Sequence, residues 1–129
     1  MPKKVAIVDD EVDISNYLAA ILEDASYTAV VVGHTEAIVE RLLEEGPDLV
    51  ILDIMMPGVS GLSLYTSLRE NSAFCRTKLV ILSGMLTSAT RNELAELTGD
   101  PAFIQPDAFI SKPVNISDFL ATVNQLLHA

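Results

Sequence analysis

The sequence is short of cysteine and of basic residues. Among its 129 residues there is one cysteine, Cys75, which excludes an intramolecular disulfide and a cysteine-based zinc site. Lysine and arginine number 8 against 18 aspartate and glutamate residues, and the formal net charge is −10. Nucleic acids and anionic membrane surfaces attract clustered lysine and arginine, so this charge argues against direct binding to either. An acidic surface instead suits cationic partners such as metal ions.

Long apolar segments, repeats and low-complexity tracts are also missing. The first residues, MPKK, precede only four apolar residues, VAIV, before two aspartates. This stretch is too short for a secretory signal or a membrane span, so we expect a cytoplasmic protein with no membrane association. Hydrophobic residues make up 50% and charged residues 20% of the chain, which is typical of a globular protein, and the length suits one domain.

Short apolar runs alternate with segments of helical periodicity. The runs are rich in β-branched residues and apolar on both faces, which predicts buried strands at 5–8, 29–32, 49–52, 79–82 and, more weakly, 108–110. Amphipathic helices are predicted at 13–24, from an N-cap at Thr35 to Gly46, at 62–70, at 88–98, and at 116–128 after a cap at Asn115. This repeated strand–helix order predicts an α/β fold, with a parallel sheet covered by helices on both faces.

Polar residues follow these strands at their carboxyl ends, where open parallel sheets bind ligands. They are Asp9, Asp10 and Glu11 after the first run, Gly33 and His34 after the second, Asp53 after the third, Ser83 after the fourth, and Ser111, Lys112 and Pro113 after the fifth. Each has a plain structural explanation as a helix cap, a turn residue or a solvated charge. Their concentration at one edge of one sheet is harder to explain in that way.

The combination indicates metal-dependent phosphoryl chemistry. Carboxylates brought close together repel one another unless a cation joins them, and Mg²⁺ prefers a few carboxylates and several waters. Asp9 and Asp10 are the candidate metal pair. Asp53, alone after a central strand, is the candidate nucleophile that would form an acyl phosphate. Lys112 and Ser83 would stabilise charge on the transferring oxygens.

With these residues in place, the chain resembles a receiver domain of two-component response regulators from Val5 to about Leu127. The matching motifs are IVDDE (7–11), PDLVILDIMMPGVSG (47–61), LVILSG (79–84) and AFISKP (108–113). The resemblance implies a single receiver domain over 1–129, with a doubly wound, flavodoxin-like five-stranded sheet in the order 2-1-3-4-5. It also implies Mg²⁺, or Mn²⁺ in its place. The implied partners are a histidine kinase or histidine phosphotransfer protein and a downstream output domain or protein.

The resemblance assigns roles by position. Asp53 would be the phosphoacceptor, Asp9 and Asp10 the acidic pair at the metal, and the backbone carbonyl of Met55 a further metal ligand. Ser83 would be the switch hydroxyl, Lys112 would contact the phosphoryl oxygens, and Phe109 would be the rotating switch aromatic. Such a protein is no enzyme, although it assists its own phosphorylation and dephosphorylation. Phosphorylation would repack the face formed by the helix at 88–98, the strand at 108–110 and the helix at 116–128, which would also be the surface for a homodimer.

Two departures from the family pattern carry further expectations. Between Ser83 and Lys112 lie 28 residues, roughly seven more than receivers commonly have. The surplus lies at 99–106 and is either a tolerated surface loop or a modified docking or dimer surface. Met55 and Met85 occupy the two positions that in this family border the path of the hydrolytic water. Since methionine offers no strong hydrogen bond to that water, we expect slow dephosphorylation.

Three other functions share parts of this pattern. A flavodoxin-like cofactor binder has the same architecture, but acids stand where its phosphate-binding loop would be. A phosphohydrolase of the haloacid dehalogenase type normally has a second acid two residues after its nucleophile, where this chain has Met55. A receiver that docks constitutively usually lacks the acidic pair, the acceptor or the lysine, and this sequence retains all of them.

Overall fold

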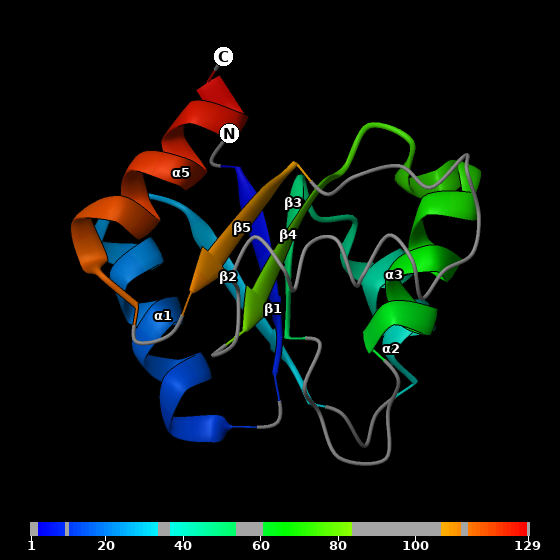
Figure 1. Cartoon of the computed structure of the whole chain (residues 1–129), viewed down its shortest axis with the longest axis horizontal. Helices are drawn as coiled ribbons and strands as arrows, with labels where there is room; N and C mark the ends of the chain where they lie inside the picture. Colours follow the sequence, from blue (N-terminus) through cyan, green and yellow to red (C-terminus); the bar gives the residue numbers. More distant parts are fainter. Residues whose placement is uncertain are drawn as a thin grey trace.

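The chain forms an open sheet of five parallel strands in the order β2-β1-β3-β4-β5 (Figure 1). The computed structural model describes residues 3–9, 11–33, 37–53, 61–83, 107–111 and 114–128. The strands are β1 (Lys4–Val8), β2 (Thr28–Val32), β3 (Leu49–Asp53), β4 (Lys78–Ser83) and β5 (Ala108–Ser111). The predicted α/β class and strand order are confirmed, and every apolar run predicted as a strand lies within an observed one.

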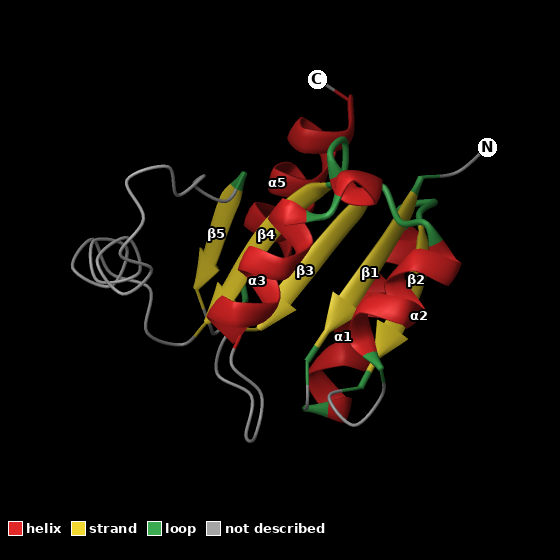
Figure 2. Ribbon diagram, turned by 90° about the vertical axis from the view of Figure 1, so that its right-hand side faces the viewer, coloured by secondary structure: helices red, strands yellow, loops and turns green. Residues whose placement is uncertain are grey.

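Helices cover both faces of the sheet (Figure 2). Helices α1 (Val12–Asp24) and α5 (Ile116–His128) lie on one face, and α2 (Ile38–Glu45) and α3 (Gly61–Glu70) lie on the other. A short 3₁₀ helix, η1 (Ser72–Phe74), follows α3. The helix predicted at 88–98 lies outside the described residues. No helix in the described part of the chain is both long enough and apolar enough to cross a membrane.

Alternate residues of each central strand fill two separate cores. In β1, Val5 and Ile7 pack with the α1 and α5 side chains, whereas Ala6 and Val8 pack with those of α2 and α3. The five residues of β3 are all buried. This explains why the strands have no polar face, because in a sheet covered on both sides neither set of side chains reaches water.

The strand register brings the carboxyl ends of the strands to one level. Val8 of β1 is aligned with Leu52 of β3, so the next residues, Asp9 and Asp53, come at adjacent points of the sheet edge. On the other side, Ser83 ends β4 opposite Ser111, which ends β5. The rigid central strands therefore set the spacing of the candidate site residues.

The helix ends agree with the sequence analysis in part. The side chain of Asn115 accepts a hydrogen bond of 3.1 Å from the amide of Asp118, which confirms it as the cap of α5. The prediction of Thr35 as the cap of α2 is wrong, because α2 begins one residue after Ala37, which occupies the N-cap position without a side-chain cap bond. The presence of a residue type that often caps helices does not by itself show where the helix begins.

Gly46 ends α2 in the left-handed conformation, with φ 57° and ψ 51°. A Cβ built at Gly46 or at Gly33 meets nothing within 4 Å, so only the backbone distinguishes the two glycines. We expect Gly46→Ala to lower the free energy of unfolding by about 1 kcal/mol, since alanine disfavours positive φ. Urea denaturation measures this change. Gly33→Ala, where no positive φ adds strain, should leave stability unchanged or slightly higher, and equal losses in both variants would contradict this account.

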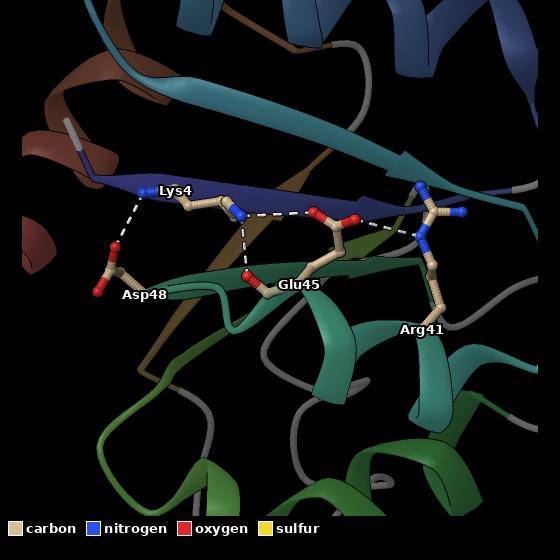
Figure 3. Close-up of polar contacts among 4 residues, drawn as sticks. All are labelled: Lys4, Arg41, Glu45 and Asp48. Atoms are coloured by element: carbon tan, nitrogen blue, oxygen red, sulfur yellow. Dashed lines mark hydrogen bonds and ion pairs between the residues drawn. The ribbon is translucent and has the colours of Figure 1, made fainter. Parts of the chain in front are cut away.

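A polar network ties α2 to the amino ends of β1 and β3 (Figure 3). The amide of Lys4 donates to Asp48 Oδ2 at 2.8 Å, and its Nζ donates to the carbonyl of Glu45 at 2.9 Å. The Glu45 carboxylate lies 3.4 Å from both Lys4 Nζ and Arg41 Nε. Because the last carbonyls of a helix have no partner within it, the Lys4 ammonium both stabilises the end of α2 and fixes it to the sheet.

A second polar group holds the carboxyl end of α5. The hydroxyl of Tyr27 lies against Asn124 Oδ1 and 3.1 Å from His128 Nε2. Burial raises the pKa of Tyr27, and its hydroxyl donates to the asparagine oxygen. Both bonds attach α5 to the segment that leads into β2.

Candidate metal centre

Three carboxylates gather at the carboxyl ends of β1 and β3. Asp9, Glu11 and Asp53 each place an oxygen so that these oxygens lie within 4.8 Å of one another. Asp9 and Asp53 are 2% and 1% exposed, whereas Glu11 is exposed to solvent. The cluster therefore has two buried acids at its base and one acid at its open side.

The turn from β1 into α1 shapes this cluster. Asp9 Oδ1 accepts a hydrogen bond of 3.0 Å from the amide of Glu11, so the side chain of the first acid fixes the backbone of the third. Glu11 is the N-cap residue of α1, but its side chain makes no capping hydrogen bond. Its carboxylate is thus directed to the neighbouring acids rather than to the first turn of its own helix.

The charge of this arrangement makes it suitable for a cation. Three like charges at such a separation repel one another, and burial of two of them removes most of the water that would screen the repulsion. The amino end of α1 offsets part of it, since a helix terminus carries about half a unit of positive charge. A hard divalent cation with oxygen ligands fits the donor set, and Mg²⁺ is such an ion.

Two of the predicted site residues, Asp9 and Asp53, are brought together as the sequence analysis expected. Asp10, Met55 and Lys112 lie outside the described residues. Ser83 closes β4, and its backbone is aligned with that of Ser111, the residue before Lys112 in the sequence. The roles given to these residues stay predictions.

Glu11 was not assigned to the metal in the sequence analysis, which gave that role to Asp9 and Asp10. The signal was present, because three consecutive acids follow the first strand. Which of them faces Asp53 depends on the backbone path between β1 and α1, and a run of acids does not specify that path. The hydrogen bond from the Glu11 amide to Asp9 supplies this information.

Phe109 lies on β5 and is partly buried against the core on the α2 and α3 side of the sheet. Tyr65 and Leu68 of α3 and Ile81 of β4 belong to the same core. The aromatic ring predicted to be a switch therefore packs from the edge strand against the core to which α2 and α3 contribute.

Comparison with known proteins matches almost the whole chain to one family. A model of the response regulator receiver domain family matches residues 5–124. The phosphate regulon transcriptional regulatory protein PhoB of Rhizobium meliloti is 32% identical over 127 residues, which cover 98% of this chain and 53% of PhoB. The regulatory protein VanR of Enterococcus faecium is 31% identical over 127 residues, or 98% of this chain and 51% of VanR. The chain thus spans about half the length of these relatives.

Solved structures agree in fold. The BeF3-activated N-terminal receiver domain of RstA from Klebsiella pneumoniae superimposes with a TM-score of 0.81 at 25% identity, covering 98% of this chain and 100% of that domain. A putative response regulator from Chloroflexus aurantiacus gives a TM-score of 0.84 at 19% identity, with 100% of both chains covered. Because its identity is only 19%, the similarity to the Chloroflexus protein concerns the fold alone.

Proposed function

The chain belongs to the response regulator receiver domain family, and we propose that Asp53 accepts a phosphoryl group from the phosphohistidine of a kinase or a phosphotransfer protein. Receiver domains are phosphoacceptors rather than conventional enzymes. The phosphorylated chain would then act on a downstream output domain or protein, or pair with a second copy of itself. The longer connection at 99–106 is proposed to modify the surface that these partners use.

One observation carries this proposal. Asp53 is 1% exposed at the end of a central strand, and its carboxylate lies within 4.8 Å of those of Asp9 and Glu11. A structural role alone would not favour three acids at this spacing, because their mutual repulsion weakens the fold. Acceptance of a phosphoryl group beside a divalent cation explains both the buried acid and its acidic neighbours.

The proposed step is an in-line displacement. An oxygen of the Asp53 carboxylate attacks phosphorus, the bond from phosphorus to the donor imidazole nitrogen breaks, and the electron pair stays on that nitrogen. The product is an acyl phosphate on Asp53. Mg²⁺ held by Asp9, Glu11 and Asp53, and by Asp10 and the carbonyl of Met55 as the resemblance implies, would supply positive charge to the transferring oxygens.

Two further side chains complete the proposed chemistry. The ammonium of Lys112 would contact a phosphoryl oxygen, and the hydroxyl of Ser83 would donate to another. Movement of Ser83 toward the phosphoryl group would free space beside β4 and β5, which Phe109 would then fill. This biases an existing equilibrium of β5, α5 and the segment 88–98, and a partner would read the result.

Acetyl phosphate tests the function directly, because its transfer needs no kinase. With Mg²⁺ the purified chain should gain one phosphoryl group by intact mass, and hydroxylamine should remove it as expected of an acyl phosphate. Chelation of Mg²⁺ by EDTA should prevent the gain. A chain that gains no phosphoryl group under these conditions, or one that resists hydroxylamine, would refute the proposed function and favour constitutive docking.

The lifetime of the acyl phosphate provides a further prediction. We expect the double variant Met55→Asn, Met85→Glu to lose its phosphoryl group about threefold to tenfold faster than the wild type, because polar side chains can orient the attacking water. Loss of the phosphorylated mass after removal of acetyl phosphate measures this rate. Leu43→Asn, an apolar-to-polar change at an exposed position of α2, is the control and should leave the lifetime unaltered. Equal lifetimes in the double variant and the wild type would show that these methionines do not protect the bond.

A further inference from the structure

A second group of polar side chains lies at the opposite end of β5 from the acidic cluster. Arg69, in the last turn of α3, donates from Nε to the hydroxyl of Tyr65 at 2.9 Å and from Nη2 to Asp107 Oδ2 at 3.2 Å. Its guanidinium also lies over the Tyr65 ring, 5.3 Å from the centroid. We call these three residues the Arg69 latch.

Asp107 attaches this latch to the sheet. It is the residue before β5, and its Oδ2 also accepts the amide of Leu79 at 2.8 Å. Its own amide donates to the carbonyl of Leu79 at 2.8 Å. One aspartate therefore closes β5 onto β4 through both backbone and side chain, and Arg69 holds the same carboxylate from α3.

β5 is a short edge strand. It has four residues and, among the strands in the described part of the chain, pairs with β4 alone. Short edge strands open more readily than central ones, since they have fewer hydrogen bonds and less buried area. A latch at the residue before β5 should thus have more influence on this strand than a similar ion pair would have on β1 or β3.

Two residues with proposed roles follow this anchor along the chain. Phe109 is two residues after Asp107 and packs in the same core as Tyr65. At the other end, Ser111 is aligned with Ser83, and Lys112 follows it in the sequence. A shift of β5 along β4 would displace the aromatic ring and the lysine together.

We propose that Arg69 is a positioning residue for the reaction at Asp53, because the Arg69 latch holds β5 in the register that positions Phe109 and the end of the strand that precedes Lys112. This inference rests on the proposed function for its chemical consequence. The structural part of the proposal is that α3 controls the positions of β5 and of the Phe109 ring. This part applies to the unphosphorylated chain and can be tested without phosphorylation.

Three variants test the proposal. Arg69→Gln removes the charge, and Arg69→Lys keeps it but lacks the planar guanidinium, whose Nε and Nη2 reach Tyr65 and Asp107 separately. Arg41→Gln is the matched control, since Arg41 pairs with Glu45 within α2 at 3.4 Å, and α2 contacts β2, at the other edge of the sheet from β5. The readouts are the rate of phosphoryl uptake from acetyl phosphate, hydrogen exchange of the Leu79 amide, and the NMR resonances of the Phe109 ring before phosphorylation.

We expect Arg69→Gln to slow phosphoryl uptake by about threefold to tenfold, to speed exchange of the Leu79 amide, and to shift the Phe109 resonances. Arg69→Lys should lie between it and the wild type, and Arg41→Gln should match the wild type. If exchange at Leu79 increases while uptake and the Phe109 resonances stay unchanged, the latch is only structural and the proposal is overturned. A wild type that takes up no phosphoryl group refutes the proposed function instead. In that case unchanged Phe109 resonances in Arg69→Gln still overturn the latch, and shifted resonances support it.

Discussion

Asp53→Asn is expected to take up no phosphoryl group from acetyl phosphate in the presence of Mg²⁺. The amide has nearly the shape of the carboxylate, so the buried position at the end of β3 is kept. An amide oxygen carries no net charge and forms no stable phosphoryl adduct, so the effect on uptake should be complete. The variant should also be at least as stable as the wild type, because it removes one of three mutually repelling acids. Intact mass measures uptake, and thermal unfolding measures stability.

Asp48→Asn is the matched control, because it makes the same change at the other end of the same strand. Asp48 directly precedes β3, and its Oδ2 accepts the amide of Lys4 at 2.8 Å (Figure 3). Asparagine retains an acceptor for that amide, so phosphoryl uptake should equal that of the wild type. Uptake by Asp53→Asn at the wild-type level would remove Asp53 from the role of acceptor. Equal loss in both variants would point to damage to β3 rather than to lost chemistry.

The sequence predicted the strands correctly where burial on both faces of the sheet restricts the choice of residue type. The run LVIL at 49–52 is apolar throughout because both faces of β3 are covered, and this requirement leaves little choice of residue type. Periodicity alone predicted a parallel sheet, but the order of its strands came from the resemblance to a family. Local signals were less reliable. Asn115 caps its helix as predicted, whereas α2 begins after Ala37 and not at Thr35.

The sequence predicted those residues of the candidate site that directly follow the strands, but not those placed by turns or by contacts between distant segments. Asp9 and Asp53 follow adjacent parallel strands, so strand geometry alone brings them close together. Glu11 joins them through the turn between β1 and α1, which depends on a hydrogen bond from its amide to Asp9. The Arg69 latch was missed for a similar reason. Arg69 and Asp107 are 38 positions apart, and neither belongs to a short motif that indicates contact.

Substitution of Glu11 is expected to have the second large effect, a loss of Mg²⁺ affinity. Glu11 belongs to the observed acidic cluster but not to the metal ligands that the resemblance implies. We expect Glu11→Gln to raise the dissociation constant for Mg²⁺ about tenfold, and Asp9→Asn to raise it by about tenfold to a hundredfold. A unit charge a few ångströms from a divalent ion contributes strongly to its binding. The effect of Glu11 is smaller because water screens its exposed carboxylate more than it screens buried Asp9. A titration of each variant with Mg²⁺, followed by NMR, measures both constants.

Glu23→Gln makes the same change in net charge at the far end of α1, where the side chain is also exposed. Its Mg²⁺ affinity should equal that of the wild type, so a loss restricted to Glu11→Gln reports on the site and not on overall charge. Glu11→Asp keeps the charge but withdraws the carboxylate by one methylene group, and we expect it to bind Mg²⁺ with intermediate affinity. If Glu11→Gln and Glu23→Gln bind Mg²⁺ equally well, Glu11 has no part in the metal centre, and the acidic pair inferred from the resemblance suffices to hold the ion.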